Sequence, residues 1–400
     1  MLFRSYCRGE DCLNTMRAFQ TMGIQIDERP EQLRVRGKGL WGLTEPSQPI
    51  DCGNSGTGIR LLAGVLAGQD FFTILTGDDS IRRRPMGRVV KPLREMGATI
   101  AGRKGGELAP LAITGSRLRG LDYQSPVASA QIKSSLLLAG LYAEGTTRVR
   151  EPRASRDHTE RMFRHFGIPV NEDASSVSIQ GRPSVGWQGK PIVVPGDLSA
   201  AAFFLVGASL VEGSDVTITN IGMNPTRTGI LDVLTDMGAD IQVLNRREEA
   251  GEPVADLRVR PARLRGIAIG PDRIPQTIDE FPILCVAAAL AEGETVISGA
   301  AELRVKESDR IATMSTELKK MGASVTETKD GLIIQGLRSE NTNRLKGASC
   351  TSYGDHRVAM SMAIAGLVAE GETTIQDTAC IETSFPGFEH KLSELLAKSC

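Results

Sequence analysis

Residues 290–297 read LAEGETVI and residues 321–325 read MGASV, and both short stretches recur along the chain. In the first stretch an Ala/Leu-rich helical run stops at a glycine and a β-branched strand follows, as the chemistry of a helix C-cap requires. In the second stretch a glycine again ends a helix and opens a strand. The two stretches therefore predict a repeated alternation of helix, glycine turn and strand.

The two signatures alternate over the whole chain. The glycine of the first signature stands at Gly68, Gly145, Gly213, Gly293 and Gly371, and that of the second at Gly23, Gly97, Gly167, Gly238 and Gly322. The pattern returns after about 70 to 80 residues, which exceeds the period of about 20 to 50 residues seen in solenoid repeats. It predicts a βαβ-rich unit in six copies, with helices on one face of parallel or mixed sheets.

The first copy is the irregular one. Within each complete pair the second glycine follows the first by 29, 22, 25 and 29 residues, but Gly23 has no partner before it. By analogy with the other copies, about 30 to 40 residues are absent from the front of the first copy. We expect its core to lack a helix and a strand, which would expose apolar surface and an unpaired strand edge. At the other end, a terminal helix is expected over residues 388–398.

Length and composition predict two domains in a cytoplasmic protein. A chain of 400 residues exceeds the size at which a single core keeps growing. The turn-rich link over residues 187–191 places the boundary so that the domains are residues 1–193 and 194–400. No apolar run is long enough for a membrane span, and the N-terminus has no signal-peptide pattern.

The charge and aromatic content argue against a nucleic-acid partner. The net charge is −1 and aromatic residues make up 4% of the chain, so there is neither a basic footprint nor a set of stacking platforms. The seven cysteines are an odd number with no CxxC pair. Reduced, mostly buried thiols are favoured over a zinc site or a disulfide framework.

Polar residues gather where predicted strands pass into predicted helices, which is where helix N-termini favour anions. These segments are residues 51–60, 78–87, 126–135 and 151–159, with a C-terminal set at 279–280, 304–310 and 355–357. Arg60, Arg84 and Arg156 are the anion ligands that the pattern favours. Simple capping, solvated charges, or a helical salt-bridge ladder from Lys306 to Arg310 are the alternatives. His158 is not favoured for proton transfer, because neighbours in sequence on a helix point apart.

Taken in order, the polar segments resemble a known enzyme family. The motifs are NSGTGIR (54–60), RRRPMG (82–87), ASAQIKS (128–134), PGDLSAAAFF (195–204), IDEFP (278–282), RVKESDR (304–310), GDHRVAM (354–360) and SFPGF (384–388). Together they resemble the 5-enolpyruvylshikimate-3-phosphate (EPSP) synthase family, the 3-phosphoshikimate 1-carboxyvinyltransferases. Their wording resembles the bacterial branch of the family that is called class II. The resemblance implies a two-domain inverse α/β barrel with six βαβαββ-like units, three per domain and the first incomplete, and an active site in the cleft between the domains.

The resemblance also implies a reaction and its residues. Shikimate 3-phosphate would be bound by Ser129, Ala130, Gln131, Arg156, Asp279 and Lys306. Phosphoenolpyruvate would be surrounded by Asn54, Gly56, Thr57, Arg84, Gln131, Glu307, Arg310 and Arg357, with Arg60 and His356 close by. Asp279 would remove the proton from the attacking 5-hydroxyl and Glu307 would protonate C3, with no metal or redox cofactor. Glyphosate would occupy the phosphoenolpyruvate site, and Gly56 leaves room for it, so the resemblance predicts a sensitive or intermediate enzyme.

Two features depart from the family pattern. The family's N-terminal PGDKS segment has no counterpart, since the one PGD here has Leu198 in place of the lysine, and Thr383 replaces a further family lysine. An alternative interpretation is therefore a chain that binds substrate but needs a separate N-terminal segment for turnover. A second alternative, UDP-N-acetylglucosamine 1-carboxyvinyltransferase, relies on a cysteine in a loop that has none here, over residues 77–84. We expect a monomer whose partners are small-molecule substrates, without nucleic acid or membrane.

Overall fold

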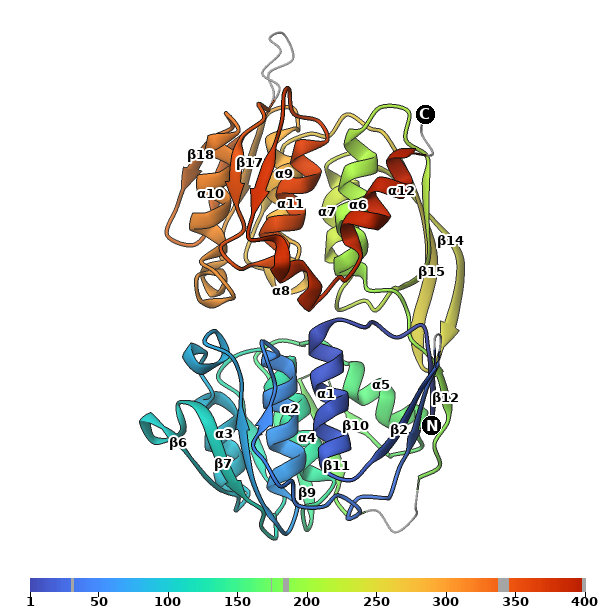
Figure 1. Ribbon diagram of the computed structural model, residues 1–400, viewed down its shortest axis with the longest axis vertical. Coiled ribbons are helices and arrows are strands. Elements are labelled where there is room, and N and C mark those ends of the chain that lie inside the picture. The colour runs from blue at the N-terminus through green and yellow to red at the C-terminus, as the bar shows by residue number, and fades with distance from the viewer. Residues whose placement is uncertain (30–31, 174, 183–186, 337–344, 398–400) are drawn as a thin grey trace. The chain divides into compact units, whose positions relative to one another are not determined.

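The computed structural model describes residues 1–400 except 30–31, 174, 183–186, 337–344 and 398–400. The described chain divides into two compact units (Figure 1). The first comprises Met1–Val194 with Glu249–Glu252, and the second comprises Pro195–Glu248 with Pro253–Cys400. Each unit has its own cluster of buried apolar side chains, so each has its own hydrophobic core. No helix in the described ranges is long and apolar enough to cross a membrane.

The first unit contains three four-stranded sheets. In spatial order they are β12 (Pro191–Val193), β1 (Leu2–Arg4), β3 (Gln32–Arg36) and β2 (Gln25–Arg29); β4 (Ile50–Asp51), β5 (Phe72–Thr76), β7 (Leu108–Thr114) and β6 (Thr99–Arg103); and β10 (Asn171–Glu172), β11 (Ser176–Gln180), β9 (Thr146–Arg150) and β8 (Asp122–Gln124). Its helices are α1 (Glu10–Thr21), α2 (Gly56–Ala67), α3 (Gly87–Glu95), α4 (Ala130–Gly140) and α5 (His158–His165), with short 3-10 turns at Ile81–Arg83 and Lys104–Gly106.

The second unit contains three further sheets. They are β13 (Val216–Gly222), β15 (Glu252–Arg260) and β14 (Asp240–Glu249); β16 (Ala268–Ile269), β17 (Glu294–Ile297), β19 (Leu332–Gln335) and β18 (Ser324–Glu327); and β20 (Ser349–Thr351) with β21 (Thr374–Gln376). Its helices are α6 (Leu198–Leu210), α7 (Gly229–Asp236), α8 (Ile274–Thr277), α9 (Phe281–Ala289), α10 (Arg310–Lys320), α11 (His356–Gly366) and α12 (Phe388–Ala397), with 3-10 turns at Ala301–Val305 and Thr378–Thr383.

One connection recurs in both units. A strand leads through a helix to a parallel neighbour, as β4 does through α2 to β5 and β20 through α11 to β21. Two antiparallel strands then complete the four-stranded sheets. Parallel neighbours need such a crossover, whereas the antiparallel pair closes through a short turn. The six sheets of the described residues match the six repeats that the sequence predicts.

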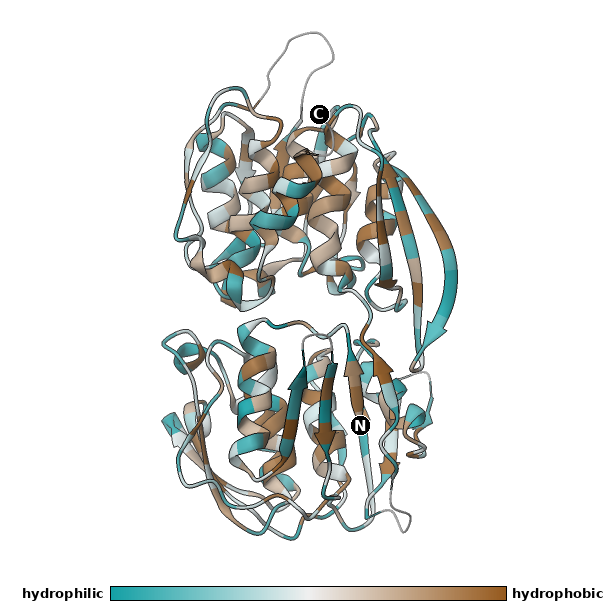
Figure 2. Ribbon diagram, turned by 45° about the vertical axis from the view of Figure 1, so that its right-hand side comes forward, coloured by the Kyte–Doolittle hydropathy of each residue, from teal (hydrophilic) through white to brown (hydrophobic). Residues whose placement is uncertain are grey.

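The helices between parallel strands form the centre of each unit. In the second unit α6, α9 and α11 contact one another, and nearly all of α6 and α9 is buried. A helix that is apolar on all sides belongs inside a core, and Figure 2 shows the long hydrophobic stretches on these central helices. In the first unit α2 packs against α4. The N-termini of α2, α4, α9 and α11 carry the polar segments at residues 51–60, 126–135, 279–280 and 355–357.

The signature glycines behave as helix stops with one exception. The backbone is left-handed, with φ between 78° and 104°, at Gly23, Gly97, Gly145, Gly167, Gly213, Gly238, Gly293, Gly322 and Gly371. Gly68 instead has φ −92°, so its turn does not require a glycine conformation. A Cβ at Gly68 would lie 2.4 Å from both Cβ and Cγ of Tyr142. Glycine is needed there for close packing rather than for a left-handed turn.

Two expectations from the sequence need correction. The first copy does not lack a strand in its sheet, because β12 lies parallel beside β1, with Leu2 opposite Pro191. The sheet with two described strands is the one at the other end of the sequence, β20 with β21. The cysteines are also less buried than expected. Cys7 and Cys12 are exposed, whereas Cys52, Cys285 and Cys350 are buried, and no disulfide joins the six described cysteines.

Candidate active site

The predicted site residues fall into two groups, one on each unit. The group on the first unit lies at the N-termini of α2 and α4. Arg60, one turn into α2, donates from Nη1 to Oε1 of Gln131 at 2.6 Å and from Nη2 to the carbonyl of Pro85 at 3.1 Å. Gln131 in turn donates to Oγ1 of Thr57 at 2.9 Å. Side chains that are 71 and 74 residues apart in sequence therefore form one hydrogen-bonded group.

The start of α2 leaves little room beside its glycine. Ser55 caps the helix, and its Oγ accepts from the backbone N–H of Gly58 at 3.0 Å. A Cβ built on Gly56 would lie 2.8 Å from Nη1 of Arg84 and 3.1 Å from Nη1 of Arg60. The two predicted anion ligands therefore present their guanidinium groups next to the N-terminus of α2, where negative charge is favoured. Asn54 at the same turn donates to Oδ2 of Asp78 at 2.6 Å.

The predicted shikimate 3-phosphate residues of the first unit stand at the start of α4 and just before α5. Ser129 is the N-cap of α4 and Ala130 its first residue. Arg156 lies in the segment between β9 and α5 and is half-buried. The capping role that the sequence left open for Ser129 is confirmed, because its Oγ accepts from the N–H of Ile132 at 3.5 Å.

The group on the second unit centres on Arg310, the first residue of α10, which is 1% exposed. Its Nε donates to Oδ2 of Asp355 at 2.8 Å and its Nη2 to Oε2 of Glu307 at 2.8 Å. Nη1 lies 3.8 Å from Oδ1 of Asp279. One buried guanidinium thus contacts three carboxylates, two of which are the predicted acid and base. Burial alone would lower the pKa of Arg310, but Asp355 and Glu307 outweigh it and raise that pKa.

Asp355 and His356 begin α11, and their ionisation is set by this surrounding charge. Burial alone would raise the pKa of Asp355, but Arg310 outweighs it and lowers that pKa. Burial, and then the charge of Arg357, lowers the pKa of His356 to about 4. His356 is therefore neutral near pH 7. Arg357 donates from Nη1 to the backbone carbonyl of Asp279 at 3.0 Å, which joins the start of α11 to the turn before α9.

The sequence reasoning singled out residues 279–280 but missed the cluster that Glu280 forms in the second unit. Glu280, 3% exposed, accepts from Oγ of Ser199, and Arg227 donates to the same Oγ at 2.7 Å. Arg227 also pairs with Asp197, the N-cap of α6. Burial, followed by the charge of Asp279, raises the pKa of Glu280. The PGDLS and IDEFP motifs contained three of these residues, but no motif pointed to Arg227.

Two details of the sequence analysis change in the structure. Lys306 lies before α10 rather than on it, so a helical ladder from Lys306 to Arg310 does not form. Lys306 instead pairs with Glu302 at 3.7 Å, and Glu307 pairs with Arg310. His158 does find a carboxylate, but from a distant segment, because its Nδ1 lies 2.7 Å from Oε1 of Glu252.

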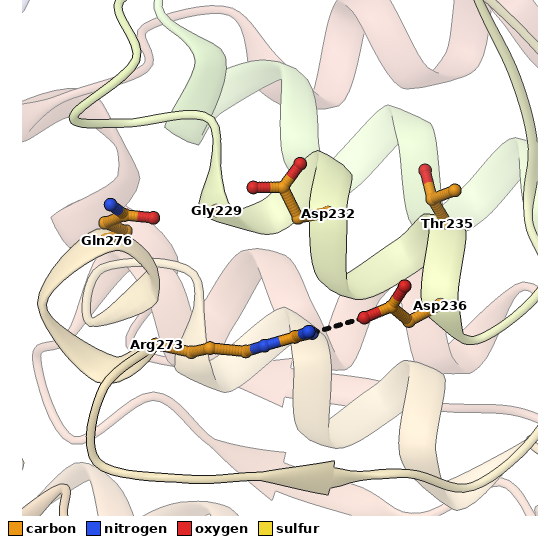
Figure 3. A pocket seen from close by; sticks show the side chains of 6 residues that line it. All are labelled: Gly229, Asp232, Thr235, Asp236, Arg273 and Gln276. Carbon is orange, nitrogen blue, oxygen red and sulfur yellow. Dashed lines mark ion pairs between the residues drawn. The ribbon is translucent and has the colours of Figure 1, made fainter.

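A pocket of about 410 Å³ in the second unit lies apart from this set (Figure 3). It is lined by Gly229, Asp232, Thr235, Asp236, Arg273 and Gln276. Arg273 pairs with Asp236 at 2.6 Å, so the charge that would attract an anion is already balanced. No residue of the predicted site lines this pocket.

Comparison with known proteins agrees with this arrangement of motifs. Residues 3–392 match the family described as EPSP synthase (3-phosphoshikimate 1-carboxyvinyltransferase). The chain is 58% identical over 393 residues to the 3-phosphoshikimate 1-carboxyvinyltransferase of Geobacter sulfurreducens, covering 98% of this chain and 90% of that protein. It is 54% identical over 393 residues to the enzyme of that name from Desulforudis audaxviator, with the same coverage.

A solved structure agrees as well. The EPSP synthase of Acinetobacter baumannii superposes with a TM-score of 0.88 at 46% identity, covering 100% of this chain and 89% of that one. The match extends over both units and all the motifs that carry the candidate site. The chain therefore belongs to the EPSP synthase family.

Proposed function

We propose that this chain transfers the enolpyruvyl group of phosphoenolpyruvate to the 5-hydroxyl of shikimate 3-phosphate and releases inorganic phosphate. The relatives named above carry this activity in their names. The observation that carries the proposal on this chain is the Arg310 group, in which one buried cation contacts Glu307 and lies close to Asp279. Such a group holds two carboxylates close together beside one cation, as general acid–base catalysis with two carboxyl groups requires.

The proton transfers follow from these two carboxylates. Asp279 takes the proton of the 5-hydroxyl while that oxygen forms a bond to C2 of phosphoenolpyruvate. Glu307 gives a proton to C3, so the addition produces a tetrahedral ketal with a methyl group. Glu307 then takes a proton back from that methyl group, which restores the double bond as the C2–O bond to phosphate breaks. Asp279 gives its proton to the departing phosphate, so both carboxylates return to their starting states.

The cations hold the substrates and stabilise the charge that develops. On the first unit, Ser129, Gln131 and Arg156 are proposed to contact shikimate 3-phosphate, and Arg84 to contact phosphoenolpyruvate. On the second unit, Arg357 is fixed by its bond to the carbonyl of Asp279 and can oppose the charge of the departing phosphate. Because His356 is neutral near pH 7, it can donate or accept a hydrogen bond but adds no charge.

Phosphate release from shikimate 3-phosphate and phosphoenolpyruvate tests the proposal. We expect Asp279→Ala to lower kcat by about 10² to 10⁴-fold, the usual contribution of a general base. Asp232→Ala is the matched control, since Asp232 is an exposed carboxylate of the same unit on α7, and it should leave kcat unchanged. Near-normal turnover by Asp279→Ala would refute its role as base. Turnover with UDP-N-acetylglucosamine in place of shikimate 3-phosphate would favour the other transferase.

A second candidate is a chain that binds shikimate 3-phosphate but turns over only when a further N-terminal segment is added. The observation behind it is in the sequence, where the one PGD segment has Leu198 in place of the lysine of the family's PGDKS segment. Phosphate release by this chain alone would exclude this candidate. Release that begins only after a synthetic segment containing a PGDKS sequence is added would establish it.

A further inference from the structure

Three charged side chains are buried together in the first unit, beside the start of α4. Lys133 on α4 lies 3.2 Å from Oε2 of Glu151 and 2.8 Å from Oε1 of Glu160. The three residues are 5%, 7% and 2% exposed respectively. Removing charges from water is costly, and a nonpolar cluster of similar size is often at least as stable. Stability alone therefore does not account for this cluster.

Glu151 completes the cap of α4 from another part of the chain. In a capping box the N-cap hydroxyl accepts from the N–H of N3, and a Glu at N3 accepts from the N–H of the N-cap. Here Ser129 makes the first bond, but N3 is Ile132, which has no acceptor. Oε1 of Glu151 takes that role and accepts from the N–H of Ser129 at 2.8 Å. The cap residue thus depends on a carboxylate 22 residues away.

The other oxygen of the same carboxylate holds the segment that carries Arg156. Oε2 of Glu151 accepts from Oγ of Ser155 at 2.8 Å, and Nζ of Lys133 donates to the backbone carbonyl of Ser155 at 3.4 Å. One carboxylate therefore joins the cap residue Ser129 to the neighbour of Arg156. These are the two places where the first unit is proposed to contact shikimate 3-phosphate.

The ammonium group keeps this arrangement charged. Burial alone would lower the pKa of Lys133, but Glu160 and Glu151 outweigh it and raise that pKa. Burial raises the pKa of Glu160 even with Lys133 beside it. Glu160 is on α5 and contacts neither Ser129 nor Ser155 in any described hydrogen bond, so it balances the charge of Lys133 without holding either segment.

We propose that Glu151, supported by Lys133, is a positioning residue that sets the spacing between Ser129 and Arg156 for shikimate 3-phosphate. The inference rests on the proposed function. Glu151 does not contact shikimate 3-phosphate itself but holds Ser129 and the segment of Arg156, which do. It concerns one substrate only, because no contact of Glu151 in the described residues reaches Arg84, Gly56 or Thr57. A carboxylate is required, since its two oxygens accept from two different segments while Oε2 also lies 3.2 Å from Nζ of Lys133.

Glu151→Gln tests the proposal with nearly unchanged shape. A Gln can accept from one of the two segments, and its amide group then faces either the Ser129 N–H or Lys133, both of which are donors. We expect KM and the calorimetric Kd for shikimate 3-phosphate to rise about tenfold, the equivalent of 1.4 kcal/mol. KM for phosphoenolpyruvate should stay within about twofold.

Glu160→Gln is the matched control within the same cluster. It removes the same charge from the same lysine, so a purely structural role predicts equal effects of both variants on thermal stability and on KM. Positioning by Glu151 predicts that Glu160→Gln lowers the melting temperature but leaves KM for shikimate 3-phosphate within about twofold. Ser155→Ala removes the hydrogen bond to Glu151 and leaves the charges in place, so it should raise that KM about threefold. It tests the proposal if Glu151→Gln does not fold.

Hydrogen exchange at the backbone N–H of Ser129 separates this inference from the proposed function. In the ligand-free protein Glu151→Gln should speed exchange there about tenfold, and Glu160→Gln should not. If the unaltered chain releases no phosphate, the proposed function fails, whatever the exchange shows. If the chain is active but Glu151→Gln leaves both Ser129 exchange and KM for shikimate 3-phosphate unchanged, or if Glu160→Gln matches it in both, the inference is overturned.

Discussion

Replacing Gly56 with alanine is expected to weaken phosphoenolpyruvate binding without destabilising the chain. A Cβ at this position lies 2.8 Å from Nη1 of Arg84, whereas ordinary contact begins at 3.4 Å. The guanidinium of Arg84 must therefore withdraw by about 0.6 Å. It is the far end of a flexible side chain, so the backbone need not move. Gly56 is the first residue of α2 and has no positive φ, so alanine should stabilise the helix by about 0.4 to 1 kcal/mol.

The substitution is expected to weaken ligand binding rather than to lower the free energy of unfolding. A hydrogen bond to a charged group contributes about 1.5 to 3 kcal/mol, and a withdrawal of this size should remove about half of it. The expected loss of about 1.4 kcal/mol corresponds to a tenfold rise in KM for phosphoenolpyruvate. KM for shikimate 3-phosphate should stay within about threefold. Since the family resemblance places glyphosate in the same site, its inhibition constant should rise at least as far.

Steady-state phosphate release with each substrate varied in turn, together with thermal melting, measures all of these effects. Gly37→Ala is the control, because a Cβ there meets nothing within 4 Å and Gly37 has no positive φ. The reasoning is refuted if Gly56→Ala leaves KM for phosphoenolpyruvate within twofold of the unaltered chain. It is also refuted if the melting temperature falls by several degrees, since Arg84 would then not be free to withdraw.

Three further predictions concern stability. Gly68→Ala should lower the free energy of unfolding by about 1 to 3 kcal/mol, because its Cβ would lie 2.4 Å from Cβ and Cγ of Tyr142; an unchanged urea midpoint would contradict this. Arg310→Gln should cost about 3 to 5 kcal/mol in urea unfolding, since it leaves Asp355 buried without its cation; a loss below 1 kcal/mol would show that Asp355 finds another partner. Folding lowers the pKa of His356 from 6.5 to about 4. Between these pH values His356 is protonated in the unfolded chain but neutral in the folded chain, so the free energy of unfolding falls as the pH drops from 6.5 to 4. His356→Gln should flatten that part of the profile by at most about 3 kcal/mol, and an unaltered difference in unfolding free energy between pH 7 and pH 4.5 would show that His356 does not cause it.

Local backbone chemistry explains why so much of the fold could be predicted. Nine of the ten signature glycines have a left-handed backbone, and this is a property of a helix end that a few neighbouring residues determine. The polar segments of the first unit also lie where strands pass into helices, as at residues 51–60 between β4 and α2, whereas residues 279–280 lie between the helices α8 and α9. Their order along the chain was enough to indicate the family, because each motif is contiguous.

Pairing between distant segments could not be predicted in the same way. No residue near Gly68 in the sequence indicates that Tyr142 packs against it. In the structure Tyr142 leaves no room for a side chain at that position. Arg227 is in no recognised motif, yet it contacts Ser199 and Asp197. The absent strand expected in the first copy was an error of the same kind, because the sequence spacing could not show that β12 lies beside β1.

The sequence by itself determined the repeat, the helix ends, the motif-bearing junctions and the family of this chain, because these depend on residues that are neighbours in the chain. Only the tertiary structure decided which charges meet. Arg310 contacts Asp355 across 45 residues and Glu151 holds Ser129 across 22. The energies of these contacts depend on distance and burial in three dimensions. The sequence alone shows neither how deeply a carboxylate is buried nor which residue it pairs with.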